Sequence, residues 1–187
     1  MNDMPLEAHE HAEHAAHAAH EKDPFISQVS ITIAVLAVVA AVAGSLETFE
    51  SGGAIISANE AVLNQDKATD QWNFFQAKSL KKNLYALAAD NGGPKAEAYK
   101  AKAKEEGAGQ DEAQAEAKKL EEESKADRAA SARHEHRHHR LSLAATFLEM
   151  GIAISTIAII TRKRWPWLAS VALGMAGAAV IGVAYLG

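Results

Sequence analysis

The chain has 187 residues, a formal net charge of −5 at pH 7 and no cysteine. The negative charge argues against nucleic-acid binding, which requires a basic surface, and the lack of cysteine excludes disulfides and thiolate metal sites. Apolar residues are concentrated in three blocks, 25–46, 141–161 and 165–186. Each block has about the 20 residues that a helix needs to cross a bilayer. The composition predicts an all-α membrane protein with three transmembrane helices and a long extramembrane, coiled-coil-like helical hairpin between the first and the second.

Residues 1–22 are rich in histidine and glutamate, interspersed with alanine. A segment of this composition cannot bury a core and is typical of a flexible tail. Neutral imidazoles at helical spacing can also share a transition-metal ion. Weak metal binding is therefore the alternative to a solvated tail.

Residues 23–46 are predicted to form the first transmembrane helix. Asp23 and Pro24 are typical of a helix start, with aspartate as the N-cap and proline at the first helical position. The acidic segment before them differs from the basic start of a signal peptide, so an uncleaved helix is expected. Gly52 and Gly53 are predicted to kink or interrupt the helix where it leaves the membrane.

Residues 47–140 are predicted to form the extramembrane hairpin, with its turn at Asn91–Pro94. Steps of three and four residues predict a partly polar seam in the outgoing arm, at Ile55, Val62, Thr69, Gln76, Ser79, Leu80, Asn83 and Leu87. In the returning arm a small-residue seam is predicted at Ala113, Ala117, Leu120, Ser124 and Ser131. A helix break is expected near Gly107 and Gly109.

One stretch of the hairpin interleaves aromatic and amide side chains. It includes Asn59, Asp70, Gln71, Trp72, Phe75, Gln76 and Lys78. Nucleic-acid binders also interleave aromatics, but they need a basic groove, and here acidic residues balance the lysines. Because Trp and Phe are common anchors of subunit contacts, this stretch is predicted to be an interaction patch. Packing of its aromatics on the returning arm is the alternative.

The run from Asp70-Gln71-Trp72 through Phe75-Gln76-Ala77-Lys78-Ser79, with Asn59, Ala61 and Lys81, resembles the signature of a bacterial membrane-protein family. That family is catalogued as domain of unknown function 4337. Its layout is similar to the one predicted here, with one N-terminal membrane helix, a helical excursion and C-terminal membrane helices. Phe74 and Phe75 depart from the family, in which tyrosine is expected to be common. The resemblance covers most of the chain after residue 22 and implies no activity.

The returning arm ends in a stretch rich in histidine and arginine, residues 133–140. Residues four apart share a helix face, so the spacing of His134, Glu135, His138 and His139 is compatible with a transition-metal site. The alternative is a basic collar whose arginines pair with lipid phosphates. Arg137 and Arg140 are also expected to reach Glu47 and Glu50 at the same interface.

Residues 141–161 are predicted to form the second transmembrane helix, and 162–187 a basic turn and the third. Glu149 lies near the middle of the second helix, where an ionisable residue is a functional-site hypothesis. It would serve either as a hydrogen-bonded contact or as a proton-carrying site. In the third helix the small residues Gly174, Ala178 and Gly182 favour close helix packing.

The leading functional hypothesis is a non-enzymatic integral membrane scaffold or interaction protein without a cofactor. Its expected partners are the lipid bilayer, further copies of itself and another membrane complex. One alternative is an ion- or proton-conducting subunit using Glu149, because the layout is similar to that of the proton-channel subunits of the biopolymer-transport and Tol energising complexes. A second alternative is a metal-binding membrane protein using the histidines. The basic turn at 162–164 predicts an inner-membrane protein with a cytoplasmic N-terminus and a periplasmic hairpin.

Overall fold

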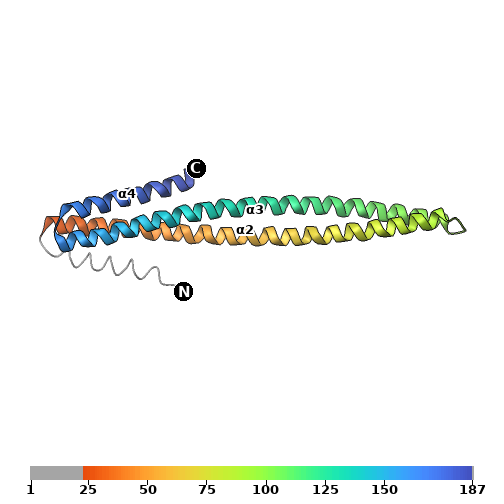
Figure 1. Ribbon diagram of the computed structural model, residues 1–187, viewed down its shortest axis with the longest axis horizontal. Coiled ribbons are helices and arrows are strands. Elements are labelled where there is room, and N and C mark those ends of the chain that lie inside the picture. Colours follow the sequence, from red (N-terminus) through yellow and green to blue (C-terminus); the bar gives the residue numbers. More distant parts are fainter. Residues whose placement is uncertain (1–22, 187) are drawn as a thin grey trace. The chain divides into compact units, whose positions relative to one another are not determined.

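The computed structural model describes residues 23–186, and over this range the chain is helical with no strand. Its elements are α2 (Pro24–Asp90), α3 (Ala96–Thr161) and α4 (Arg164–Leu186) (Figure 1). Each of the three helices contains a stretch that is long and apolar enough to cross a membrane. The predicted all-helical class with three long apolar helices is therefore confirmed. The histidine-rich segment 1–22 lies outside the described residues.

The helix start and the turn follow the local sequence signals. The backbone N–H of Phe25 donates a hydrogen bond of 2.9 Å to the Asp23 side chain, as an N-cap does. Between α2 and α3, Gly92 and Gly93 have φ angles of 74° and 97°. This left-handed region is open to glycine at no steric cost, and glycine commonly ends a helix in this way. The predicted turn at Asn91–Pro94 is thus confirmed.

The predicted break near Gly107 and Gly109 is wrong, because α3 runs through both residues. Helix α2 likewise runs through Gly52 and Gly53, so the helix is not interrupted there. At two of these positions the glycine instead permits a close contact. A Cβ on Gly53 would lie 2.9 Å from His134 Nδ1, and a Cβ on Gly109 would lie 3.2 Å from the Lys78 side chain. A glycine costs a helix only about 1 kcal/mol, which tertiary packing readily offsets.

The chain divides into two compact units. The terminal unit comprises the described residues of 1–53 and 133–187, and the middle unit comprises 54–132. The helices themselves pass without interruption through the predicted borders at 46/47 and 140/141.

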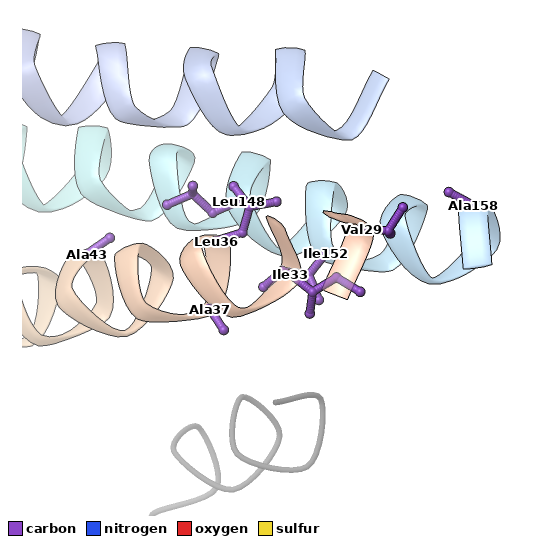
Figure 2. Packing of buried hydrophobic residues seen from close by; sticks show 8 residues of the cluster. All are labelled: Val29, Ile33, Leu36, Ala37, Ala43, Leu148, Ile152 and Ala158. Carbon is purple, nitrogen blue, oxygen red and sulfur yellow. The ribbon is translucent and has the colours of Figure 1, made fainter. Parts of the chain in front are cut away.

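The core of the terminal unit lies between α2 and α3. Its buried cluster contains Val29, Ile33, Leu36, Ala37 and Ala43 from α2 with Leu148, Ile152 and Ala158 from α3 (Figure 2). The α2 members Val29, Leu36 and Ala43 are seven residues apart, which keeps them on one side of the helix. On α4, Trp167 packs edge-to-face on Phe25 and donates a hydrogen bond to the Thr32 hydroxyl.

Helix α4 joins this core through small residues. Leu36 fills the space that a Cβ on Gly174 would occupy, and a Cβ on Gly177 would lie 3.0 Å from the Ala144 carbonyl oxygen. Of the predicted stripe, the structure buries Gly174, leaves Ala178 exposed and shows nothing within 4 Å of a Cβ on Gly182. A strict four-residue spacing rotates by roughly 40° per step around a helix. The contact therefore passes to Gly177, which is three residues on.

In the middle unit, the contact between α2 and α3 consists mainly of small side chains. The buried residues are Ala61, Ala68 and Ala89 from α2 and Ala113, Ala117, Leu120 and Ser124 from α3. Ser124 Oγ donates to the carbonyl oxygen of Ala61 at 2.8 Å, and Ser131 Oγ donates to that of Ala54 at 2.9 Å. The returning seam was predicted correctly. The outgoing seam is wrong, because Ile55, Val62, Leu80 and Leu87 are exposed.

Glycine-to-alanine changes on α4 test this packing. Gly177→Ala places a methyl group against Leu148 and the Ala144 backbone, so we expect a loss of about 1–3 kcal/mol from overpacking. The matched control, Gly182→Ala, meets open space and should leave stability unchanged or raise it slightly through helix propensity. Thermal unfolding in detergent measures both. Equal melting temperatures would contradict the assigned α4 contact.

Candidate functional site

A cluster of polar side chains lies inside the terminal unit, around Glu50. This carboxylate is only 3% exposed. It follows Ala43 by seven residues and so continues the row of α2 that contains Val29 and Leu36. Because residues seven apart share one side of a helix in contact with another, the geometry of α2 directs Glu50 into the interior.

Three side chains from two other helices surround Glu50. His134 Nδ1 lies 2.6 Å from Glu50 Oε2, and Arg137 Nη1 lies 3.8 Å from Glu50 Oε1. The Tyr185 hydroxyl donates to Glu50 Oε1 at 3.3 Å, and Arg137 also lies over the Tyr185 ring. A buried carboxylate is tolerated only with such partners. The cluster therefore connects α2, α3 and α4 at one point.

Two further contacts extend this cluster along the helices. His138 Nδ1 lies 3.3 Å from the Glu47 carbonyl oxygen and 3.8 Å from Glu47 Oε1. Arg140 Nη1 donates to the Val183 carbonyl oxygen at 2.9 Å. The predicted contact between Arg137 and Glu50 is present, whereas Arg140 binds the backbone of α4.

The candidate metal ligands are divided between two faces of α3. His134 and His138 face the carboxylates of α2, whereas Glu135 and His139 are exposed. Within residues 23–186, no group of three or more His, Asp or Glu side chains is placed to hold a metal ion. The two half-buried imidazoles of His134 and His138 thus have carboxylate partners, and metal binding by this segment stays a prediction.

Glu149 has the opposite environment to Glu50. It is exposed on α3, next to the fully buried Leu148 and the half-exposed Met150. No side chain within residues 23–186 makes a hydrogen bond or ion pair with it. Its carboxylate therefore faces away from the helices of its own chain, in the middle of an apolar stretch.

The structure separates the predicted interaction patch into two parts. Trp72 Nε1 donates to Glu121 at 2.7 Å, and the Phe75 ring packs edge-to-face on Trp72. Lys78 pairs with Glu106 at 2.8 Å. These side chains contact α3 within the middle unit or pack on one another, and Gln71 is half-buried beside them. The remaining members are exposed: Asn59, Asp70 and Gln76.

The ion pair between Lys78 and Glu106 stays charged over the whole neutral range. Its hydrogen-bonded contact raises the pKa of Lys78 and lowers the pKa of Glu106. The stability due to Glu106 is present above its unfolded pKa of 4.5 and is lost as pH falls through the lowered folded value. The stability due to Lys78 is present below 10.5 and is lost as pH rises through the raised folded value. The pair therefore cannot act as a switch near neutral pH.

The Glu50 cluster was only partly foreseen from the sequence. The topology predicts that Arg137 reaches Glu50, but the sequence pattern assigns His134 to a candidate metal site and does not predict the contact with Tyr185. The seven-residue spacing from Val29 through Leu36 and Ala43 to Glu50 is visible in the sequence. It could have identified Glu50 as an inward-facing residue.

Substitutions at Glu50 and His134 test whether the cluster depends on charge pairing. His134→Leu leaves a buried carboxylate without its nearest partner, so we expect a loss of about 1–3 kcal/mol of stability. Adding Glu50→Leu removes the buried charge, and replacing a buried pair by apolar residues is often neutral or stabilising. The double variant should therefore melt above the His134→Leu variant. A double variant that is less stable than His134→Leu would contradict the pairing.

Comparison with known proteins identifies one family. The family model described as "Domain of unknown function (DUF4337)" matches residues 25–187. No curated protein and no solved structure matches the chain. The family match extends over the three helices, the Glu50 cluster and the aromatic stretch, which is most of the sequence. The chain belongs to the DUF4337 family.

Proposed function

We propose that this protein is a non-enzymatic integral membrane scaffold that assembles with further copies of itself. The observation that carries the proposal is Glu149, which is exposed and without a partner in the described part of its own chain. It lies within the apolar stretch of α3, residues 141–161. The other acidic residues close to the apolar stretches of the terminal unit, Glu47, Glu50 and Asp23, all contact histidine or arginine side chains.

A carboxylate at this depth of a bilayer is costly, and such residues almost always face protein or water. Since the outward face of α3 offers no partner from the same chain, a neighbouring chain is the source that this proposal assigns. Interhelical hydrogen bonds of polar side chains contribute to helix association in membranes. Glu149 would then stabilise the assembly by donating or accepting such a bond across the contact.

A proton-carrying role for Glu149 is the second candidate, and it rests on the same exposure. A titratable group that faces an intersubunit space or water can exchange protons, whereas a sealed one cannot. Proton-carrying carboxylates occur in this setting in pumps and transporters. The two candidates differ in whether titration of the group is needed.

The proposed arrangement in the membrane uses three crossings. The apolar parts of α2, α3 and α4 would span the bilayer, and residues 47–140 would form an extramembrane helical hairpin with coiled-coil-like packing. The seven-residue spacing of the half-buried Ala54 and the buried Ala61 and Ala68 on the inner face of α2 supports this packing. The basic turn at 162–164 favours a cytoplasmic location for that loop and for the N-terminus.

Two substitutions of Glu149 separate the candidate roles. Glu149→Gln keeps hydrogen bonding but cannot titrate, so an assembly contact should persist while proton flux in liposomes should stop. Glu149→Leu removes both abilities and should reduce the size of the assembly measured in mild detergent. Thr146→Leu, an exposed position one turn away on α3, is the matched control. Unchanged size, melting and proton leak in both Glu149 variants would refute the proposed role of this residue.

The three-span arrangement is tested by site-directed labelling. Because three crossings place the hairpin and the C-terminus on one side, cysteines at Asn91 and Gly187 should react alike with an impermeant reagent in intact cells. A cysteine at Lys163 should react in the opposite way. The natural chain contains no cysteine, so each signal has one source. Opposite labelling at 91 and 187 would overturn the arrangement.

A further inference from the structure

The middle unit exposes large apolar side chains on one of its two helices. Eight such residues of α2 are between 51% and 63% exposed: Ile55, Ile56, Val62, Leu63, Phe74, Leu80, Leu84 and Leu87. The α3 part of the unit, 96–132, has no exposed large apolar residue. Its outward side chains instead form ion pairs with one another, such as Lys119 with Glu116 and Lys125 with Glu122.

The exposed apolar residues of α2 follow a regular spacing. Ile56, Leu63 and Leu84 lie at multiples of seven residues, and Leu80 and Leu87 are also seven apart. The first row is offset by two residues from the buried row of Ala54 and Ala61, which corresponds to roughly 200° around the helix. The residues on this side of α2 are named the outer row. Its large apolar members are Ile56, Leu63, Leu80, Leu84 and Leu87. A helix with apolar rows on opposite sides is typical of a larger bundle.

We propose that the outer row is the contact surface for the outer row of a second copy of this chain, paired in parallel and in register. This inference deepens the proposed scaffold function and rests on it for one point: copies inserted in the same membrane have the same orientation. In a parallel, in-register pair, each apolar residue of the outer row meets its own equivalent. No apolar side chain is then left against a polar one.

The polar centre of the outer row restricts the register. Asp66, Asp70 and Asn73 are exposed between the apolar ends. A shift by one or two heptads would bring Leu63 or Leu84 against Asp70 or Ala77, whereas the in-register pair keeps each leucine against its own equivalent. A polar group inside such a contact is known to specify register at a cost in stability. The paired carboxylates of Asp66 and of Asp70 are the source of that cost here.

The size of the outer row agrees with a dimer contact. Monomeric soluble proteins rarely expose contiguous apolar patches larger than a few hundred Å². The outer row has five large apolar side chains that are 53–63% exposed, Ile56 and Leu63 before the polar centre and Leu80, Leu84 and Leu87 after it. A standard interface buries about 800 Å² on each partner, so a stable pair needs contact along the whole outer row, with the polar centre included.

Single cysteines in the full-length, membrane-embedded protein test the pairing. We expect Leu63→Cys and Leu84→Cys each to form a disulfide-linked dimer of twice the chain mass when copper phenanthroline is added as the oxidant. Lys119→Cys, equally exposed on the outward side of α3, is the matched control and should stay monomeric. When the Leu63→Cys and Leu84→Cys chains are coexpressed, the 63–84 product should be absent, because the pair is in register.

The remaining outcomes distinguish this inference from the scaffold proposal. Equal crosslinking at 63, 84 and 119 would indicate random collision and overturn the outer-row contact, as would its absence at 63 and 84. A crosslink to a protein of different mass would assign the surface to another partner and also overturn it. If Glu149→Leu reduces the assembly while 63 and 84 do not crosslink, the inference fails alone. If 63 and 84 crosslink while the Glu149 variants change nothing, the role of Glu149 fails alone.

As a second measurement, Asp70→Asn should increase the crosslinked fraction several-fold at both positions, because it removes the like-charge repulsion between the two Asp70 carboxylates but keeps a polar group in the row. No increase, or a decrease, would overturn the parallel, in-register pairing. Asp70→Asn, Leu63→Cys and Leu84→Cys change exposed side chains and should leave the helical content, measured by circular dichroism, unaltered.

Discussion

The close approach of α2 and α3 is the constraint on which the other features of each unit depend. Where the contact row consists of alanine, serine and glycine, side chains are too small to separate the two backbones. Ser124 and Ser131 can then donate to carbonyl oxygens of the opposite helix, and the His134 ring can lie against Gly53. A polar group in this row has no water beside it, so its partner must come from the other helix. Glu50 meets this requirement with His134, Arg137 and Tyr185.

This use of small residues explains which predictions from the sequence succeeded. Three apolar blocks, the N-cap at Asp23 and the turn at Asn91–Pro94 depend on strong local signals, and the structure contains each of them. The prediction for the outgoing seam is wrong because it places bulky residues such as Val62 and Leu80 in the contact. The actual contact uses Ala61 and Ala68. Hydropathy ranks leucine and valine above alanine, whereas close helix packing prefers alanine.

The candidate site shows the same limit of sequence reasoning. A histidine four residues from another histidine indicates a shared helix face but not what lies opposite that face. Here the opposite helix presents Glu47 and Glu50, so the imidazoles of His134 and His138 meet carboxylates. Only the pairing of α2 with α3 supplies this information. The glycines were misread for a related reason, because the close contact of Gly53 with His134 depends on a residue 81 positions away in the chain.

Two carboxylates in the terminal unit illustrate how position decides the role of a residue type. Glu50 lies on the contact side of α2 and is fully provided with partners from its own chain. Glu149 lies on the outer side of α3, next to the buried Leu148, and has none within residues 23–186. The first therefore contributes to the fold of one chain, whereas the second is a cost that one chain alone does not offset. The exposed apolar residues of α2 in the middle unit present the same kind of problem with the opposite chemistry. The outward face of α3 in the same unit is charged, so the unit does not expose large apolar side chains over its whole surface. The exposed apolar residues of α2 therefore need an explanation of their own. In the proposed assembly, a neighbouring chain would resolve both the unpaired carboxylate in an apolar stretch and the apolar row outside it, and each can be tested without the other.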